Sequence, residues 1–171
     1  MLAVGQALSL LPQQMDTPAA RVMLYAIGLQ ESNLKHRWQV TDPKRPEHMG
    51  PARGLWQFER GGGVAGVMAH KASAKHAEAL CHHFGVAPNT YDVYGHLHLP
   101  EYDALAAGLA RLLLWTDPAP LPAVGESIAA FAIYTRVWRP GAFHRGTPTQ
   151  RESLRRKWAY NYETAVGMVG A

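Results

Sequence analysis

The sequence predicts a mainly helical fold with little or no β-sheet, formed as a single domain by residues 1–171. Apolar residues recur at helical spacing in most segments between the proline and glycine breaks. No stretch has the apolar–polar alternation of a long strand, and no segment repeats. Hydrophobic residues make up 47% of the chain and charged residues 18%, which is typical of a globular protein and not of a disordered one.

The first two helices are predicted from caps and apolar spacing. Residues 2–11 are apolar but too few to cross a bilayer, so we expect a short packed helix there. A longer helix follows, with Asp16 or Thr17 as its cap and Pro18 in its first turn. Its apolar spacing predicts that it ends near Asn33.

Proline- and glycine-rich segments separate the remaining elements. Residues 38–53 predict a loop that can include a small irregular hairpin, and a turn region follows Pro88-Asn89. The proline-rich segment at 117–122 ends a leucine-rich helix. The helices predicted in this part of the chain cover residues 63–69, 71–84, 100–115, 124–137 and about 148–169.

Charge and cysteine content limit the partners and the location. Seventeen Lys and Arg residues against 13 Asp and Glu residues give a net charge of +4, which suits an anionic partner such as cell-wall glycan, lipid headgroups or nucleic acid. Cys81 is the only cysteine, so the chain has no internal disulfide. We predict neither a signal peptide nor a membrane span, so action outside the cytoplasm would require delivery by other means.

Glu31 is the main catalytic candidate, because it ends an apolar helical run and is followed by Ser32. A group that protonates a glycosidic oxygen must hold its proton near neutral pH, which requires a raised pKa. Apolar surroundings and the negative end of a helix both disfavour the charged carboxylate. A solvated glutamate or a capping partner is the alternative for this position.

A glycine-rich segment, Gly-Pro-Ala-Arg-Gly-Leu-Trp-Gln-Phe at residues 50–58, is the second feature that points to a glycan site. Gly54 would let the backbone approach a sugar closely, Trp56 would pack beneath the sugar, and Gln57 would bind an acetamido or hydroxyl group. The alternative is a tight turn that fills its own core with Leu55 and Phe58.

Together these segments resemble the lytic transglycosylases, a lysozyme-like family whose pattern is Glu-Ser, a variable gap and then Gly-Ala-x-Gly-Leu-Met-Gln. Here the two motifs are Glu-Ser at 31–32 and Pro-Ala-Arg-Gly-Leu-Trp-Gln at 51–57. The third motif of the family, Ala-Tyr-Asn-Ala-Gly, is similar to Ala-Ile-Tyr-Thr-Arg at 132–136, and Trp138 follows it. The resemblance covers residues 17–141 and implies a lysozyme-like domain.

The resemblance implies cleavage of the β-1,4 bond between N-acetylmuramic acid and N-acetylglucosamine in peptidoglycan. Glu31 would protonate the bridging oxygen and then take a proton from the 6-hydroxyl of the muramic acid, which closes a 1,6-anhydro ring. No metal or cofactor is implied. The residues implied to bind or position the glycan are Ser32, Gly54, Trp56, Gln57, Tyr134 and Trp138.

A hydrolytic muramidase is the alternative within the enzyme class. It would usually need a second carboxylate, about 5–5.5 Å or roughly 6.5–9.5 Å from the first. Asp42, in the Pro- and Lys-rich loop, and Glu59, directly after Phe58, are the candidates. A solvated surface position is the alternative for both.

Departures from the family pattern keep another class of function open. Pro51 replaces a glycine, Trp56 a methionine and Thr135 an asparagine, and the gap from Glu31 to Gln57 is longer than usual. A virion or tail component that only binds glycan or phage proteins is therefore a second alternative. The resemblance extends to bacteriophage lysis and virion enzymes, and so implies delivery to the cell wall, in the periplasm, by a phage particle or lysis system.

Other reactive and basic residues give weaker signals. The nine histidines form no His-Glu-x-x-His motif, so no metal is predicted. Cys81 lies within an alanine-rich helical stretch and is expected to be a spectator. A basic stretch on the last helix is interpreted as a solvated face, with attraction to an anionic wall or to phosphate as the alternative. No nucleic-acid motif accompanies it, so a nucleic-acid binder indifferent to Glu31 is the least favoured hypothesis. The stretch consists of Arg151, Arg155, Arg156 and Lys157.

Overall fold

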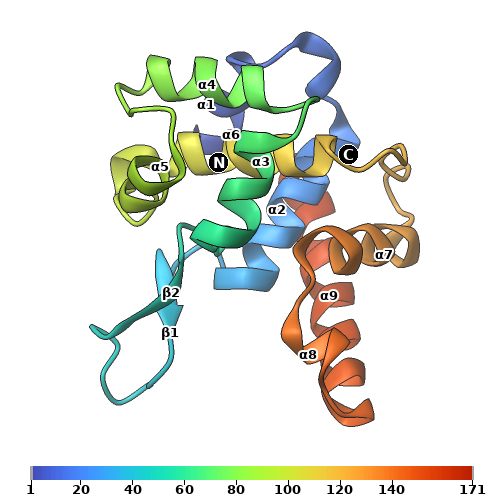
Figure 1. Cartoon of the computed structure of the whole chain (residues 1–171). Coiled ribbons are helices and arrows are strands. Elements are labelled where there is room, and N and C mark those ends of the chain that lie inside the picture. Colours follow the sequence, from blue (N-terminus) through green and yellow to red (C-terminus); the bar gives the residue numbers. More distant parts are fainter. Residues whose placement is uncertain (1, 171) are drawn as a thin grey trace.

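The computed structural model describes residues 2–170. Over that range the chain is mainly helical with one small antiparallel sheet, which confirms the predicted fold class (Figure 1). Its α-helices are α1 (Leu2–Ser9), α2 (Pro18–Ser32), α3 (Ala65–Ala69), α4 (Ala74–His83), α5 (Thr90–His96), α6 (Asp103–Trp115), α7 (Ser127–Trp138), α8 (Gly141–His144) and α9 (Pro148–Val169). The strands are β1 (Trp38–Val40) and β2 (Met49–Arg53), and the short helical turns are η1 (Gln13–Met15), η2 (Arg60–Val64) and η3 (Pro100–Tyr102).

The ends of α2 are set by local sequence, as predicted. Thr17 Oγ1 accepts a hydrogen bond of 3.1 Å from the Ala20 amide, and Pro18 occupies the first helical position. Asn33 ends the helix in a left-handed conformation with φ 56°. Residues 22–27 are buried, and α2 packs along α9 and against α6, so the last turn of α2 has a fixed place in the fold.

α6 lies in the middle of the core, where residues 104–112 are all buried. It contacts α1, α2, α3 and α4. The proline-rich segment that follows ends it as predicted. α7 begins at Ser127 and not at residue 124, because Gly125 has a φ of 97°, which no α-helix accommodates.

The turn region after Pro88 contains a helix that the sequence analysis did not predict. Asn89 Oδ1 accepts hydrogen bonds from the amides of Tyr91 and Asp92, at 3.0 and 2.9 Å, and this cap begins α5. α5 also holds the neighbouring sheet, since the Tyr94 hydroxyl donates to the carbonyl of Pro51 in β2 at 2.6 Å.

The loop at 38–53 does contain a hairpin, in which Trp38 pairs with Arg53 and Val40 with Met49. Its base is tied to α6 by two hydrogen bonds from Arg37 to Asp103, of 2.8 and 2.6 Å. In Figure 1 the hairpin lies on one side of the C-terminal end of α2, and α7 and α8 lie on the other. Among residues 2–170, none of the helices has the length and hydropathy of a membrane-spanning segment.

Candidate active site

A cleft of about 660 Å³ lies at the C-terminal end of α2. The segment that leads from β2 into η2 forms one wall, and the end of α7 with α8 forms the other. Glu31, Gln57, Tyr134 and Trp138 line this cleft. The fold therefore brings together one predicted site residue from α2, one from the glycine-rich turn and two from α7.

Glu31 is half-buried in the cleft, and its Oε1 accepts a hydrogen bond of 2.7 Å from the Tyr134 hydroxyl. Burial raises the pKa of Glu31 from 4.5 to about 7, against the opposing effects of the Tyr134 bond and the Lys157 charge. Near pH 7 the Glu31 carboxyl group is therefore close to its pKa, whereas an ordinary glutamate is fully ionised. The carboxyl group can donate a proton and take one back in the same pH range.

Tyr134 is a fixed donor to this carboxyl group. Only 1% of its surface is exposed, and its ring stacks on Trp158 with the centroids 4.8 Å apart and the planes 14° from parallel. Burial and the neighbouring Glu31 raise the pKa of Tyr134 well above its ordinary value, so the phenol keeps its proton. The stacking fixes the ring and so holds the hydroxyl oxygen 2.7 Å from Glu31 Oε1.

α9 supports Glu31 through the preceding residue, Gln30, which is buried. Lys157 Nζ donates to the Gln30 carbonyl at 2.6 Å, and Asn161 Nδ2 donates to Gln30 Oε1 at 2.8 Å. The sequence analysis missed Gln30 and Asn161. Lys157 is exposed, as its interpretation as part of a solvated face expects, but the bond of its Nζ to Gln30 was not predicted. The spacing of Lys157 and Asn161 on one side of α9 was the only signal available.

Gln57 lies in the cleft with a positive φ of 52°, at the end of the turn that Gly54 begins. Its Nε2 donates to the carbonyls of Gly54 and His36, at 2.9 and 3.3 Å. Both bonds use the amide nitrogen, so the amide oxygen is the group left to accept a hydrogen bond from a ligand.

Gly54 packs against protein and does not approach the cleft, contrary to the sequence prediction. It is buried with φ 73°, and a Cβ on it would lie 3.0 Å from the carbonyl oxygen of Leu97 and 3.5 Å from Ala106. The absence of a side chain therefore lets the turn pack closely against α6 and the end of α5.

Trp56 and Ser32, which the sequence analysis named as glycan-binding residues, lie in the core and do not line the cleft. The Trp56 indole is 1% exposed and donates to the Leu24 carbonyl at 2.9 Å. Ser32 is buried, and its hydroxyl donates to the Leu55 carbonyl at 2.6 Å. Both bonds join the glycine-rich turn to α2, which is how the turn is held beside Glu31.

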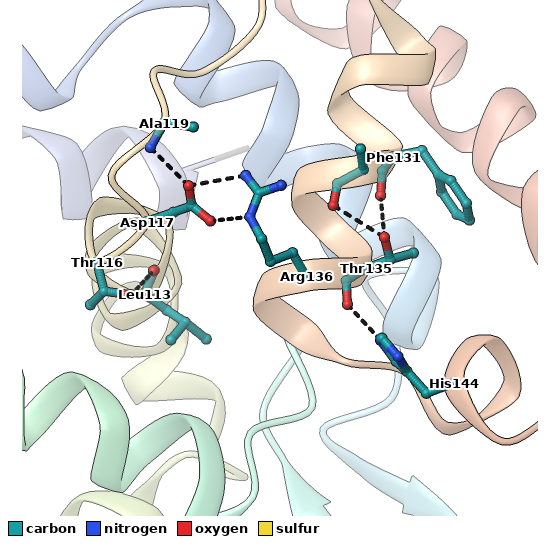
Figure 2. Close-up of polar contacts among 9 residues, drawn as sticks. Leu113, Thr116, Asp117, Ala119, Phe131, Thr135, Arg136 and His144 are labelled. Atoms are coloured by element: carbon teal, nitrogen blue, oxygen red, sulfur yellow. Dashed lines mark hydrogen bonds and ion pairs between the residues drawn. The ribbon is translucent and has the colours of Figure 1, made fainter.

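Trp138 reaches the cleft from the end of α7, and its Nε1 donates to the carbonyl of Trp56 at 3.1 Å. Thr135, which replaces the family asparagine, is buried and makes its hydroxyl bonds within α7, to Phe131 and Ala132 (Figure 2). His144 of α8 bonds to the Thr135 carbonyl at 2.9 Å in the same view. Thr135 thus holds α8 at the cleft rim through its backbone.

Of the two candidates for a second carboxylate, only Glu59 lines the cleft, where it is exposed and lies beside Gly62. Asp42 is in the loop between β1 and β2 and forms an ion pair of 2.9 Å with Arg45. Cys81 is buried in α4, and burial raises the pKa of its thiol to about 11, which disfavours the nucleophilic thiolate. Residues 2–170 contain no group of three or more His, Cys, Asp or Glu side chains placed to hold a metal.

Comparisons of the chain with protein-family models, with curated proteins and with solved structures found no match. Any function must therefore be inferred from the residues of the cleft.

Proposed function

We propose that the protein is a peptidoglycan lytic transglycosylase in which Glu31 is first the general acid and then the general base. The observation that carries this proposal is the carboxyl group of Glu31, which has a pKa of about 7 and lines a cleft open to a ligand. The hydroxyl of the buried Tyr134 orients this carboxyl group. A group near its pKa at the working pH is equally able to donate and to accept a proton. One such group suffices when the nucleophile belongs to the substrate.

The reaction proceeds in two proton transfers. Glu31 gives its proton to the oxygen that bridges muramic acid and N-acetylglucosamine, and the bond from that oxygen to C1 of the muramic acid breaks. The Glu31 carboxylate then takes the proton of the muramic acid 6-hydroxyl while O6 forms a bond to C1. The tethered hydroxyl brings a large effective concentration, on the order of 10⁵ M or more in favourable models.

The hydrogen bond from Tyr134 determines which oxygen of Glu31 exchanges the proton. Its hydroxyl occupies Oε1, so Oε2 is the oxygen that carries the exchanged proton. The same hydrogen bond strengthens when the carboxylate becomes charged, which offsets part of the cost of a buried anion. Tyr134 is therefore a positioning residue that also stabilises the intermediate charge state.

The rest of the cleft suits an anionic amino sugar. The Gln57 amide oxygen accepts the acetamido N–H, and the Trp138 ring offers an apolar surface to a sugar ring. Arg139 and Arg145 line the same cleft, and both are exposed. Peptidoglycan strands carry carboxylates on their peptide stems, and these two charges attract them.

Hydrolysis is the second candidate, because Glu59 lies in the same cleft. In that mechanism Glu59 would activate water, and the product would be a reducing muramic acid. We also propose, from the resemblance to phage enzymes, that the protein reaches the wall in a phage particle or through a lysis system.

The products released from purified peptidoglycan sacculi test the proposal. Incubation with the wild-type protein should release muropeptides whose muramic acid is lighter by one water than the hydrolytic product, as measured by mass spectrometry. Products of the full mass would replace the proposal by a muramidase that uses Glu59. Sacculi that bind the protein but yield no soluble muropeptide would identify a glycan-binding component without catalysis.

A further inference from the structure

A second cavity, of about 470 Å³, lies beside the C-terminal end of α6, away from the residues proposed to act in catalysis. Leu113 lines the active-site cleft, and the next residue, Leu114, lines this cavity. The wall is largely apolar and comes from α6, the proline-rich segment that follows α6, and the start of α2. Its apolar members are Ala19, Leu114, Trp115, Pro118, Ala119, Pro120 and Leu121.

A buried cation, Arg111, forms part of the same wall. The residue is 3% exposed, and its guanidinium lies over the Trp115 ring at 5.0 Å from the centroid. Nε donates to the Met15 carbonyl at 2.7 Å, but the buried Nη1 has no hydrogen-bond partner among the described residues. Burial lowers the pKa of Arg111 to about 10, so the group still carries its charge near neutral pH.

The carboxylates near Arg111 are already paired with other arginines. Asp16 accepts two hydrogen bonds of 2.6 Å from Arg21. Asp117, which also lines the cavity, accepts bonds of 2.6 and 3.0 Å from Arg136 and a third from the amide of Ala119 (Figure 2). Within the described part of the chain no carboxylate forms an ion pair or a hydrogen bond with Arg111, although the charge of Asp16 opposes part of the effect of burial on the pKa of Arg111.

A buried charge that lacks a partner is costly, and a bound anion removes that cost. We propose that this cavity binds an organic monocarboxylate, whose charge pairs with Arg111 and whose apolar part packs on Trp115 and the proline-rich segment. A doubly charged phosphate fits less well, because only one charge can be matched and Asp117 stands in the same wall. The cavity volume lies within the range of about 300–1,000 Å³ that is usual for small-molecule sites.

The carboxylate can come from a lipid or from the C-terminus of a peptide, and probe compounds separate these sources. Calorimetric titration of the whole protein would compare hexanoate, N-acetyl-alanyl-alanine, hexanamide and inorganic phosphate. We expect hexanoate or the dipeptide to bind at least about tenfold more tightly than hexanamide, because only the carboxylates pair with the guanidinium. The tighter of the two carboxylates identifies the source. Equal binding of hexanamide, binding of phosphate alone, or no binding of either carboxylate would overturn the proposal.

Two substitutions place the binding in this cavity. Arg111→Met should weaken carboxylate binding by about tenfold or more and leave hexanamide unaffected, because it removes the charge and keeps the volume. Arg156→Met, which removes the same charge from an exposed position on α9, is the matched control. Ala19→Phe narrows the cavity without changing Arg111, so it should weaken the binding of every ligand. It is the second test of the site if Arg111→Met does not fold. Wild-type affinity for the carboxylates in either cavity variant would contradict the assignment.

Discussion

Glu31 is half-buried and Arg111 is buried, and the surroundings of these two ionisable groups meet the cost of burial in different ways. Glu31 becomes neutral by binding a proton, so burial moves its pKa to about 7. Arg111 keeps its proton even though burial lowers its pKa to about 10. A buried carboxyl group therefore offers a proton that can be exchanged, whereas a buried guanidinium offers a permanent charge that only an anion can match.

The charged form of Glu31 has a hydrogen-bond donor beside it, whereas most N–H groups of Arg111 have no acceptor in the part of the protein that the structure describes. Tyr134 donates to Glu31, so the charged form of the carboxyl group has a partner when it is needed. Among residues 2–170, Arg111 has one hydrogen-bond acceptor, the Met15 carbonyl, for a group with five N–H donors. The first arrangement suits proton transfer and the second suits ligand binding.

Glu31→Gln should produce the largest change of any single substitution. The amide has almost the same shape but cannot donate or accept the catalytic proton, so release of soluble muropeptides should fall by about 10²- to 10⁴-fold. Glu163→Gln, an exposed glutamate of α9, controls for the loss of one negative charge. Release at the wild-type rate by folded Glu31→Gln protein would remove Glu31 from the mechanism.

Between pH 4 and pH 8 the free energy of unfolding should depend on the titration of Glu31 and not on that of Arg111. The folded pKa of Glu31 lies above its unfolded value, so the folded state holds the proton more tightly, and stability is lost as pH rises from about 4.5 to about 7. The full loss corresponds to at most about 3 kcal/mol.

Urea unfolding of the wild type and of Glu31→Gln between pH 4 and pH 8 measures this loss. The substituted protein should gain stability relative to the wild type by up to about 3 kcal/mol as pH rises. Arg111→Met should instead change the free energy of unfolding by the same amount throughout this range, because Arg111 stays charged. A constant difference between Glu31→Gln and the wild type would show that the pKa of Glu31 is not raised.

Tyr134→Phe should shift the pH dependence of cleavage without removing the acid. The Tyr134 bond lowers the pKa of Glu31, so its loss should raise that pKa further, and activity should persist to higher pH before it falls. We expect a lower maximal rate as well, because the carboxylate loses its partner. Tyr160→Phe, which changes an exposed tyrosine on α9, should leave the profile in place. An alkaline limb that moves to lower pH would contradict the role given to Tyr134.

The parts of the fold that the sequence predicts are those determined by local chemistry. The Thr147-Pro148 start of α9 and the Thr17-Pro18 start of α2 are both confirmed by capping hydrogen bonds. The position of Glu31 at the end of an apolar helix is also determined by neighbouring residues in the sequence, and its raised pKa follows from burial.

The parts that the sequence does not predict depend on contacts between distant segments. The direction of the Trp56 side chain is set by the Leu24 carbonyl, 32 positions earlier in the chain, so its motif position alone wrongly favours the glycan groove. Gln30 and Asn161 are 131 positions apart. Arg111 sits among leucines at ordinary helical spacing, and only the pairing of Asp16 with Arg21 and of Asp117 with Arg136 shows that no carboxylate is bonded to it.

Arg139 and Arg145 complete the comparison, because they are exposed cations in the cleft and differ in this respect from the buried Arg111. Charges in water gain little from any one contact but attract an anionic polymer over about 10 Å at 0.1 M salt. Replacing both by glutamine should raise KM for sacculi by only a few-fold at low salt and leave kcat nearly unchanged. Added salt should erase the difference from the wild type, as measured by the rate of muropeptide release against sacculus concentration. Replacement of Lys71 and Arg156, two exposed cations outside the cleft, provides the control for net charge. An effect that persists at 1 M salt would mean that Arg139 and Arg145 make direct, desolvated contacts with the substrate.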